Sequence, residues 1–128
     1  MFIVAGVVLT CGYNLELFGG LLHSDFWFGA AWGAFPVLVG AYAQHWTLPP
    51  PVLVAAAAAF LLSMGQRSLS TPARALRRRI ASVSVRVTWR DGTQQELDRA
   101  DLLAPLERAL RYLTWATGTL AVALVVAR

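Results

Sequence analysis

The residues with the clearest chemical potential are arginines gathered in one short stretch. Five of them lie between positions 67 and 79, at Arg67, Arg74, Arg77, Arg78 and Arg79. An arginine close to an anionic membrane surface contributes about 1 kcal/mol to binding, so this cluster could bind anionic lipid headgroups or another phosphate group. Alternatively, its charge only sets the orientation of the neighbouring apolar segments. Because the cluster adjoins an apolar segment and not a basic face of a folded domain, we expect no nucleic-acid partner.

A second group of polar residues surrounds the end of the first apolar segment. Its members are Tyr13, Asn14, Glu16, His23 and Asp25. Polar groups near a membrane are costly and often functional, although at helix ends they also serve as interfacial caps. His23 and Asp25 are too few to hold a metal ion, which takes three or four protein ligands. We therefore expect a polar cluster at one membrane surface, without a metal site.

No pattern typical of catalysis accompanies these two groups. The sequence contains no glycine-rich phosphate loop, no serine elbow, no zinc-ligand spacing and no paired carboxylate motif. The single cysteine, Cys11, lies in an apolar stretch and is interpreted as a small packing residue. Glu96, Asp98 and Asp101 surround a predicted turn and helix start, which accounts for them structurally. The residues themselves therefore predict no catalytic side chain, no metal and no cofactor.

The elements that must position these residues are apolar segments. Hydrophobic residues make up 57% of the 128-residue chain and charged residues 14%, whereas about 25% charged is usual for a soluble domain. Four apolar segments stand out, at residues 1–18, 26–46, 51–64 and 113–127. The second has the length of about 20 residues that a span needs, and the others reach it once amphipathic flanks are included. The predicted fold is an all-α transmembrane helix bundle of about four spans.

The distribution of charge predicts the orientation of these segments. Ten of the eleven arginines lie in residues 67–111, and the absence of lysine suggests a GC-rich bacterial genome. Because positively charged loops face the cytoplasm, we expect this block inside and both termini outside a bacterial cytoplasmic membrane. The predicted parts are three spans in residues 1–66, a cytoplasmic segment in residues 67–104, and an amphipathic helix start with the fourth span in residues 105–128. The lipid bilayer is then the main partner.

The cytoplasmic segment carries the pattern of a β-hairpin between spans three and four. Residues 82–89 alternate between apolar and polar side chains, as in a half-buried strand. Asp91-Gly92 is a strong signal for a tight turn, and residues 93–97 can return as the second strand. An isolated hairpin is marginal in water, so we expect it to lean on the following helix or on the membrane surface.

Two prolines help to predict where helices start. Ser70-Thr71-Pro72 predicts a turn or a helix start before the arginine run. The next helix is expected to begin near Asp101 as its N-cap. Pro105 would then lie in the first turn, where it removes no hydrogen bond within the helix. This helix is expected to continue into the last span.

Small residues in the second apolar segment form a close-packing face. Gly29 and Gly33 make a GxxxG pair, which lets two helices approach closely in lipid. The pair can pack against another helix of the same chain or against a second copy of the chain. Pro36 follows and is expected to kink the helix.

Part of the sequence resembles a known family. Residues 12–17, with sequence Gly-Tyr-Asn-Leu-Glu-Leu, and residues 28–40 resemble a mid-chain segment of the UbiA prenyltransferase superfamily, and residues 66–72 with the hairpin and a last span resemble the tails of UbiA-like hypothetical proteins. The resemblance implies a bundle of about nine spans, in which two Asp-rich motifs hold Mg²⁺ that binds a prenyl diphosphate. Only Tyr13 and Asn14 match the pattern here, and residues 66–79 contain no Asp or Glu where the second motif is expected. No Mg²⁺ site therefore carries over.

Three functions stay open. The first is a polytopic membrane protein without a catalytic site, a truncated or degenerate UbiA-like protein; an apolar segment directly after Met1 suggests a chain that begins inside a longer protein or at a mis-called start. The second is part of a prenyl-diphosphate-using transferase, with Mg²⁺ as cofactor, completed by a missing N-terminal half or another chain. The third is a small membrane interaction protein, in which Gly29 and Gly33 form a homodimer and the hairpin binds a soluble partner.

Overall fold

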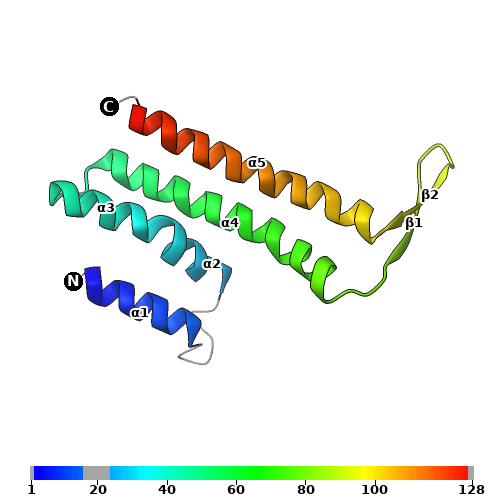
Figure 1. Cartoon of the computed structure of the whole chain (residues 1–128), viewed down its shortest axis with the longest axis horizontal. Helices are drawn as coiled ribbons and strands as arrows, with labels where there is room; N and C mark the ends of the chain where they lie inside the picture. The colour runs from blue at the N-terminus through cyan, green and yellow to red at the C-terminus, as the bar shows by residue number, and fades with distance from the viewer. Residues whose placement is uncertain (1, 16–23, 127–128) are drawn as a thin grey trace. The chain divides into compact units, whose positions relative to one another are not determined.

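The chain is mostly helical, with one small antiparallel sheet, as Figure 1 shows. A computed structural model describes residues 2–15 and 24–126. Its elements in chain order are α1 (Phe2–Asn14), α2 (Asp25–Phe28), the π-helical segment η1 (Gly29–Ala34), α3 (Phe35–His45), α4 (Pro50–Arg78), β1 (Ser84–Thr88), β2 (Gln94–Asp98) and α5 (Arg99–Val126). The helices divide into two compact units, Met1–Arg67 and Ser68–Arg128, with the boundary inside α4.

Three helices are long and apolar enough to cross a membrane. They are Asp25–His45, which joins α2, η1 and α3, and the single helices Pro50–Arg78 and Arg99–Val126. A fourth apolar helix, Phe2–Gly12, is shorter. The predicted all-α class with a hairpin insert is confirmed. About four helices of spanning length were expected, and the described part of the chain contains three.

Burial is the reverse of what a soluble domain shows. In the described residues the buried hydrophobic side chains are Ala56 and Ala73, both of them small. Large apolar side chains are exposed instead, for example Ile3 at 83%, Trp115 at 72% and Val126 at 79%. Leucine, valine and phenylalanine are normally the residues that fill a core. The described helices therefore leave many of their large apolar side chains exposed.

In the first unit, glycines bring the second apolar helix against α4. A Cβ atom placed on Gly33 would lie 2.5 Å from the carbonyl oxygen of Ala59, and one on Gly29 would lie 2.9 Å from the Phe60 ring. Both glycines are buried. The GxxxG face thus packs against a helix of the same chain, at a distance that admits no side chain at position 33. α1 packs against α3 in the same unit, with the Phe2 and Tyr42 rings 4.8 Å apart.

The helix widens just before Pro36. In η1 the amide of Phe35 donates to the carbonyl of Ala30, five residues earlier, so the turn contains one residue more than an α-helical turn. Pro36 follows within the first turn of α3. Because proline has no amide hydrogen, the start of a helical segment is where it fits with the least loss.

In the second unit, the predicted hairpin is confirmed. β1 and β2 pair antiparallel, with Val85 opposite Leu97 and Arg86 opposite Glu96. β1 is shorter than the predicted range, and β2 is shifted by one residue toward the C-terminus. Gly92 has φ +85°, which glycine adopts without strain. Asp91 stabilises the turn because its Oδ1 accepts hydrogen bonds from the Thr93 amide at 3.0 Å and the Thr93 hydroxyl at 2.7 Å.

Two predicted helix starts are wrong. α5 begins at Arg99, so Asp98 is the N-cap, and Pro105 lies inside the helix and not in its first turn. Asp101 occupies the third helical position, where it pairs with the cap. α4 runs without a break through Ser70-Thr71-Pro72. Pro72 removes one donor, but alanine, leucine and arginine follow it, and these are strong helix formers.

Candidate functional site

The predicted arginine cluster is divided between the two units. Arg67 belongs to the first unit, where its Nε donates to Asp25 Oδ1 and its guanidinium lies 4.8 Å from the centre of the Phe28 ring. Its side chain is only 22% exposed. The ring contact is a cation–π interaction, which adds to the ion pair. Arg67 therefore connects α4 to the start of the second apolar helix.

Asp25 is the one described side chain of the predicted polar cluster. Tyr13 and Asn14 end α1, but their side chains, like the whole of Glu16 and His23, lie outside the described residues. Asp25 opens α2, and the N-cap is Ser24, whose hydroxyl accepts from the Trp27 amide at 3.4 Å. The sequence signal for this cap was a serine directly before an acidic residue and an aromatic run.

The second unit brings the other arginines toward α5. Two adjoining cavities lie between the last turns of α4 and the middle turns of α5. The larger, of about 480 Å³, is called here the α4–α5 groove and is lined by Arg77, Glu107, Leu110, Arg111, Thr114 and Trp115. The smaller, of about 240 Å³, is lined by Ser70, Ala73, Arg74, Arg77, Arg78 and Leu110. Arg77 and Leu110 border both cavities, so the two lie next to each other.

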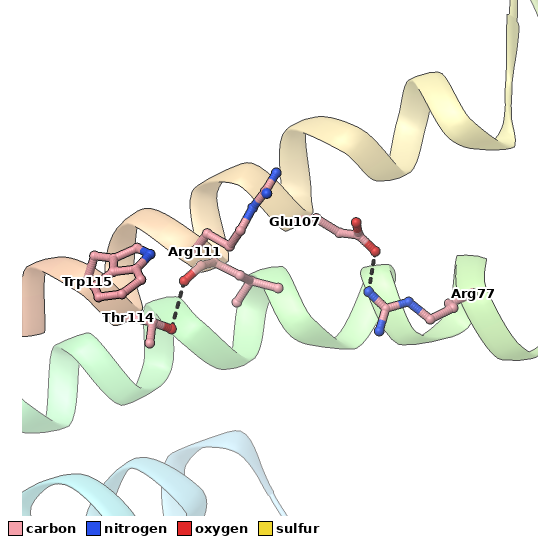
Figure 2. Close-up of a pocket in the computed structure, with 6 residues that line it drawn as sticks. Arg77, Glu107, Arg111, Thr114 and Trp115 are labelled. Atoms are coloured by element: carbon pink, nitrogen blue, oxygen red, sulfur yellow. Dashed lines mark hydrogen bonds and ion pairs between the residues drawn. The ribbon is translucent and has the colours of Figure 1, made fainter. Parts of the chain in front are cut away.

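An ion pair joins the two helices at the groove. Arg77 on α4 donates through Nη2 to Glu107 Oε1 on α5, as the dashed line in Figure 2 shows. The Arg77 side chain is 62% exposed and that of Glu107 34%. Exposed pairs of this kind contribute about 0–1 kcal/mol. The pair therefore contributes little to stability, and it marks where α4 and α5 face each other at the groove.

The α5 wall of the groove changes from charged to apolar along one helix face. Glu107 and Arg111 are four residues apart, and Trp115 follows four residues later, so the three lie one above another. Figure 2 shows this succession along α5. The Thr114 hydroxyl donates back to the Leu110 carbonyl at 3.0 Å, which satisfies it within its own helix. The groove thus has a polar end and a hydrophobic end.

The charge around the two cavities is positive. Four arginines border them, Arg74, Arg77, Arg78 and Arg111, against the single carboxylate of Glu107. Among the described residues, Arg74, Arg78 and Arg111 take part in none of the three ion pairs. Arg79 lies just past α4 and borders neither cavity. Arginine stays protonated and offers five N–H donors in a planar fork, which suits it to phosphate and carboxylate ligands.

The arginines that line the site suit it to an anionic ligand. The lining of the two cavities holds no cysteine, histidine or lysine. Residues 2–15 and 24–126 contain no group of three or more His, Cys, Asp or Glu side chains that could hold a metal ion. Outside the site, hydrogen bonds lower the pKa of two described carboxyl groups: that of Asp91, mainly through Thr93, and that of Asp98, mainly through the Asp101 amide.

No protein-family model, curated protein or solved structure matches the chain. The resemblance to the UbiA superfamily therefore stays a prediction. The spacing of four residues predicts a favourable pair of Glu107 and Arg111 on one helix face, and Trp115 is expected near the inner membrane surface, but the sequence did not predict that these residues border a site. Their role depends on α4 lying opposite, which spacing along α5 does not reveal.

Proposed function

We propose that the chain is a polytopic integral membrane protein of a bacterial cytoplasmic membrane, whose arginine-rich helix ends bind anionic lipid headgroups at the inner surface. The observation that carries this proposal is the reversed burial, with Ala56 and Ala73 inside and the large apolar side chains outside. In water, that much exposed apolar surface would drive aggregation. In a bilayer the acyl chains cover it.

The lengths of α4 and α5 support the same arrangement. α4 has 29 residues and α5 has 28, and at about 1.5 Å per residue each is more than 40 Å long. The hydrocarbon core of a bilayer is about 30 Å thick. Each helix therefore extends past the core by about two turns. The surplus falls at the arginine-rich end of α4 and the charged start of α5, where headgroups and cytoplasm would surround it.

The orientation follows from the arginines. The positive-inside rule assigns the hairpin and both arginine-rich ends to the cytoplasm. Arg111 is the last charged residue of α5, and Tyr112 and Trp115 lie within the next turn, with exposed side chains. Aromatic residues of this type favour the level of the headgroups. Both termini would then be external, α1 crossing the membrane as well.

Two measurements test the proposal. Alkaline carbonate should leave the full chain in the membrane pellet, and detergent should release it; release by carbonate would overturn the proposal. A reporter active only in the cytoplasm should be active when fused after Asp91 and inactive when fused after Arg128. The opposite pattern would leave the membrane assignment standing and reverse the orientation.

A further inference from the structure

We infer that the α4–α5 groove is a discrete site for one anionic phospholipid, in which Arg111 and Arg77 contact the phosphate and Leu110 and Trp115 contact the hydrocarbon. The inference rests on the proposed function, since the lipid must reach the groove from the surrounding bilayer. It goes beyond that function because a general attraction of arginines to a charged surface needs no groove and selects no single molecule.

The phosphate position follows from the charges. Arg111 lines the groove and makes no ion pair within the described part of the chain. Arg77 donates one N–H to Glu107. A guanidinium group has five N–H donors, so Arg77 keeps others for a ligand. Arg74 and Arg78 border the adjoining cavity and raise the positive potential there. A phosphodiester, with one charge and two free oxygens, matches two guanidinium forks.

The hydrocarbon position follows from the other end of the groove. Trp115 is 72% exposed, and the Thr114 hydroxyl is already bonded to Leu110, so this end presents mostly apolar surface. Farther along α5, Val122 and Val126 lie on the same helix face as Trp115, seven and eleven residues later, and both are exposed, so they continue that surface. An acyl chain that starts at Trp115 can therefore run along α5 into the bilayer. The groove volume of about 480 Å³ falls within the range of about 300–1,000 Å³ for small-molecule sites.

A substitution of Glu107 is expected to raise the lipid affinity, whereas a substitution of Arg111 is expected to lower it. The Glu107 carboxylate is the one negative group in the lining, and it holds Arg77. Glu107→Gln removes the repulsion of the phosphate and frees the Arg77 donor. We expect this substitution to raise the affinity for an anionic lipid several-fold, whereas loss of a merely structural contact would not raise it.

The experiment is native mass spectrometry of the full chain in detergent, titrated with phosphatidylglycerol or phosphatidylcholine of the same acyl chains. We expect one phosphatidylglycerol to stay bound in preference to phosphatidylcholine. Arg111→Gln should weaken its binding about tenfold, the loss typical of one charged hydrogen bond. Arg108→Gln is the matched control, because it removes the same charge from the same helix at a residue that borders neither cavity. It should leave the binding unchanged.

Three results would overturn the inference: equal binding of the two lipids, equal loss in Arg108→Gln and Arg111→Gln, or displacement of phosphatidylglycerol by millimolar inorganic phosphate. The last would assign the site to free phosphate and not to a lipid. Trp115→Ala separates the two parts of the ligand, since it should weaken a long-chain lipid and leave a water-soluble glycerophosphate unaffected. A chain that resists carbonate extraction but binds no lipid selectively would refute the groove site alone and leave the proposed function intact.

Discussion

Asp98 and Asp101 each accept a hydrogen bond from the other's backbone amide, and both bonds measure 2.9 Å. This reciprocal pair is a capping box, with an aspartate in place of the usual glutamate at the third helical position. It closes the first turn of α5 directly after the last residue of β2, so the hairpin joins the helix without a linker. Arg99 adds a contact from the other side, since its Nη1 donates to the Ile80 carbonyl at 3.3 Å.

The capping box predicts where the second unit opens first. Asp98→Ala removes the acceptor of the Asp101 amide, so amides in the first turn of α5 should exchange with solvent several-fold faster, as measured by hydrogen exchange. Asp98→Asn is the control, because asparagine caps helices about as well as aspartate. Equal acceleration in the two variants would mean that the charge of Asp98, and not its cap, holds the turn.

Acid should loosen the same junction. Hydrogen bonds hold the pKa of Asp98 below its usual range, chiefly that from the Asp101 amide, and the pKa of Asp91 is lowered in the same way by Thr93. A carboxyl group whose pKa is lower in the folded state stabilises that state above its ordinary pKa, and this contribution disappears as the pH falls through the lowered value. Exchange at the hairpin turn and the start of α5 should therefore rise below about pH 4. Asp98→Asn should flatten the response at the helix start only.

The glycine face predicts a sharp difference between two positions on one helix. Gly33→Leu forces a side chain into the Ala59 backbone, whereas a Cβ atom on Gly40 meets nothing within 4 Å. Overpacking a tight contact costs about 1–3 kcal/mol, so Gly33→Leu should lower the unfolding midpoint in detergent and Gly40→Leu should not. Loss of dimers by Gly33→Leu without loss of stability would instead support the homodimer hypothesis.

The pair of Arg67 and Asp25 can be measured by a double-mutant cycle with Arg67→Gln and Asp25→Asn. The expected coupling energy is about 0.5–1 kcal/mol, because the Asp25 side chain is 61% exposed and solvent screens the pair. Arg67→Gln alone should destabilise the first unit more than Asp25→Asn, since it also removes the cation–π contact with Phe28. Equal effects would mean that the ring contributes nothing.

The local sequence patterns predicted the individual helices and strands better than the contacts between them. The alternation in residues 82–89 and the Asp91-Gly92 pair were sufficient for the hairpin, because strand period and turn chemistry are local. Asp98 and Asp101 are equally good caps by composition, and only the geometry of the strand that precedes them selects Asp98. Pro105 was predicted in the first turn because Asp101 was taken as the N-cap. The cap is Asp98, three residues earlier, so Pro105 lies inside the helix.

The candidate site could not be predicted from local patterns, because it depends on contacts between residues that are far apart in the sequence. Arg77 was predicted to face phosphate, but the groove also needs Arg111 and Trp115 from a helix that starts more than twenty residues later. Arg67 was grouped with the other arginines by proximity in sequence. In the structure it contacts Asp25 and Phe28, which are far away along the chain.

The wide turn of η1 makes the second apolar helix equivalent to a regular helix with a single-residue insertion. The wide turn absorbs the extra residue, so the parts of the helix before and after η1 keep the facing of one regular helix. Deleting Ala31 would therefore restore regular winding with Asp25 still toward Arg67 and Gly33 still on Ala59. A deletion elsewhere in the helix would instead rotate its two parts by about 100° relative to each other. η1 is thus the place where the chain can lose one residue without losing either contact.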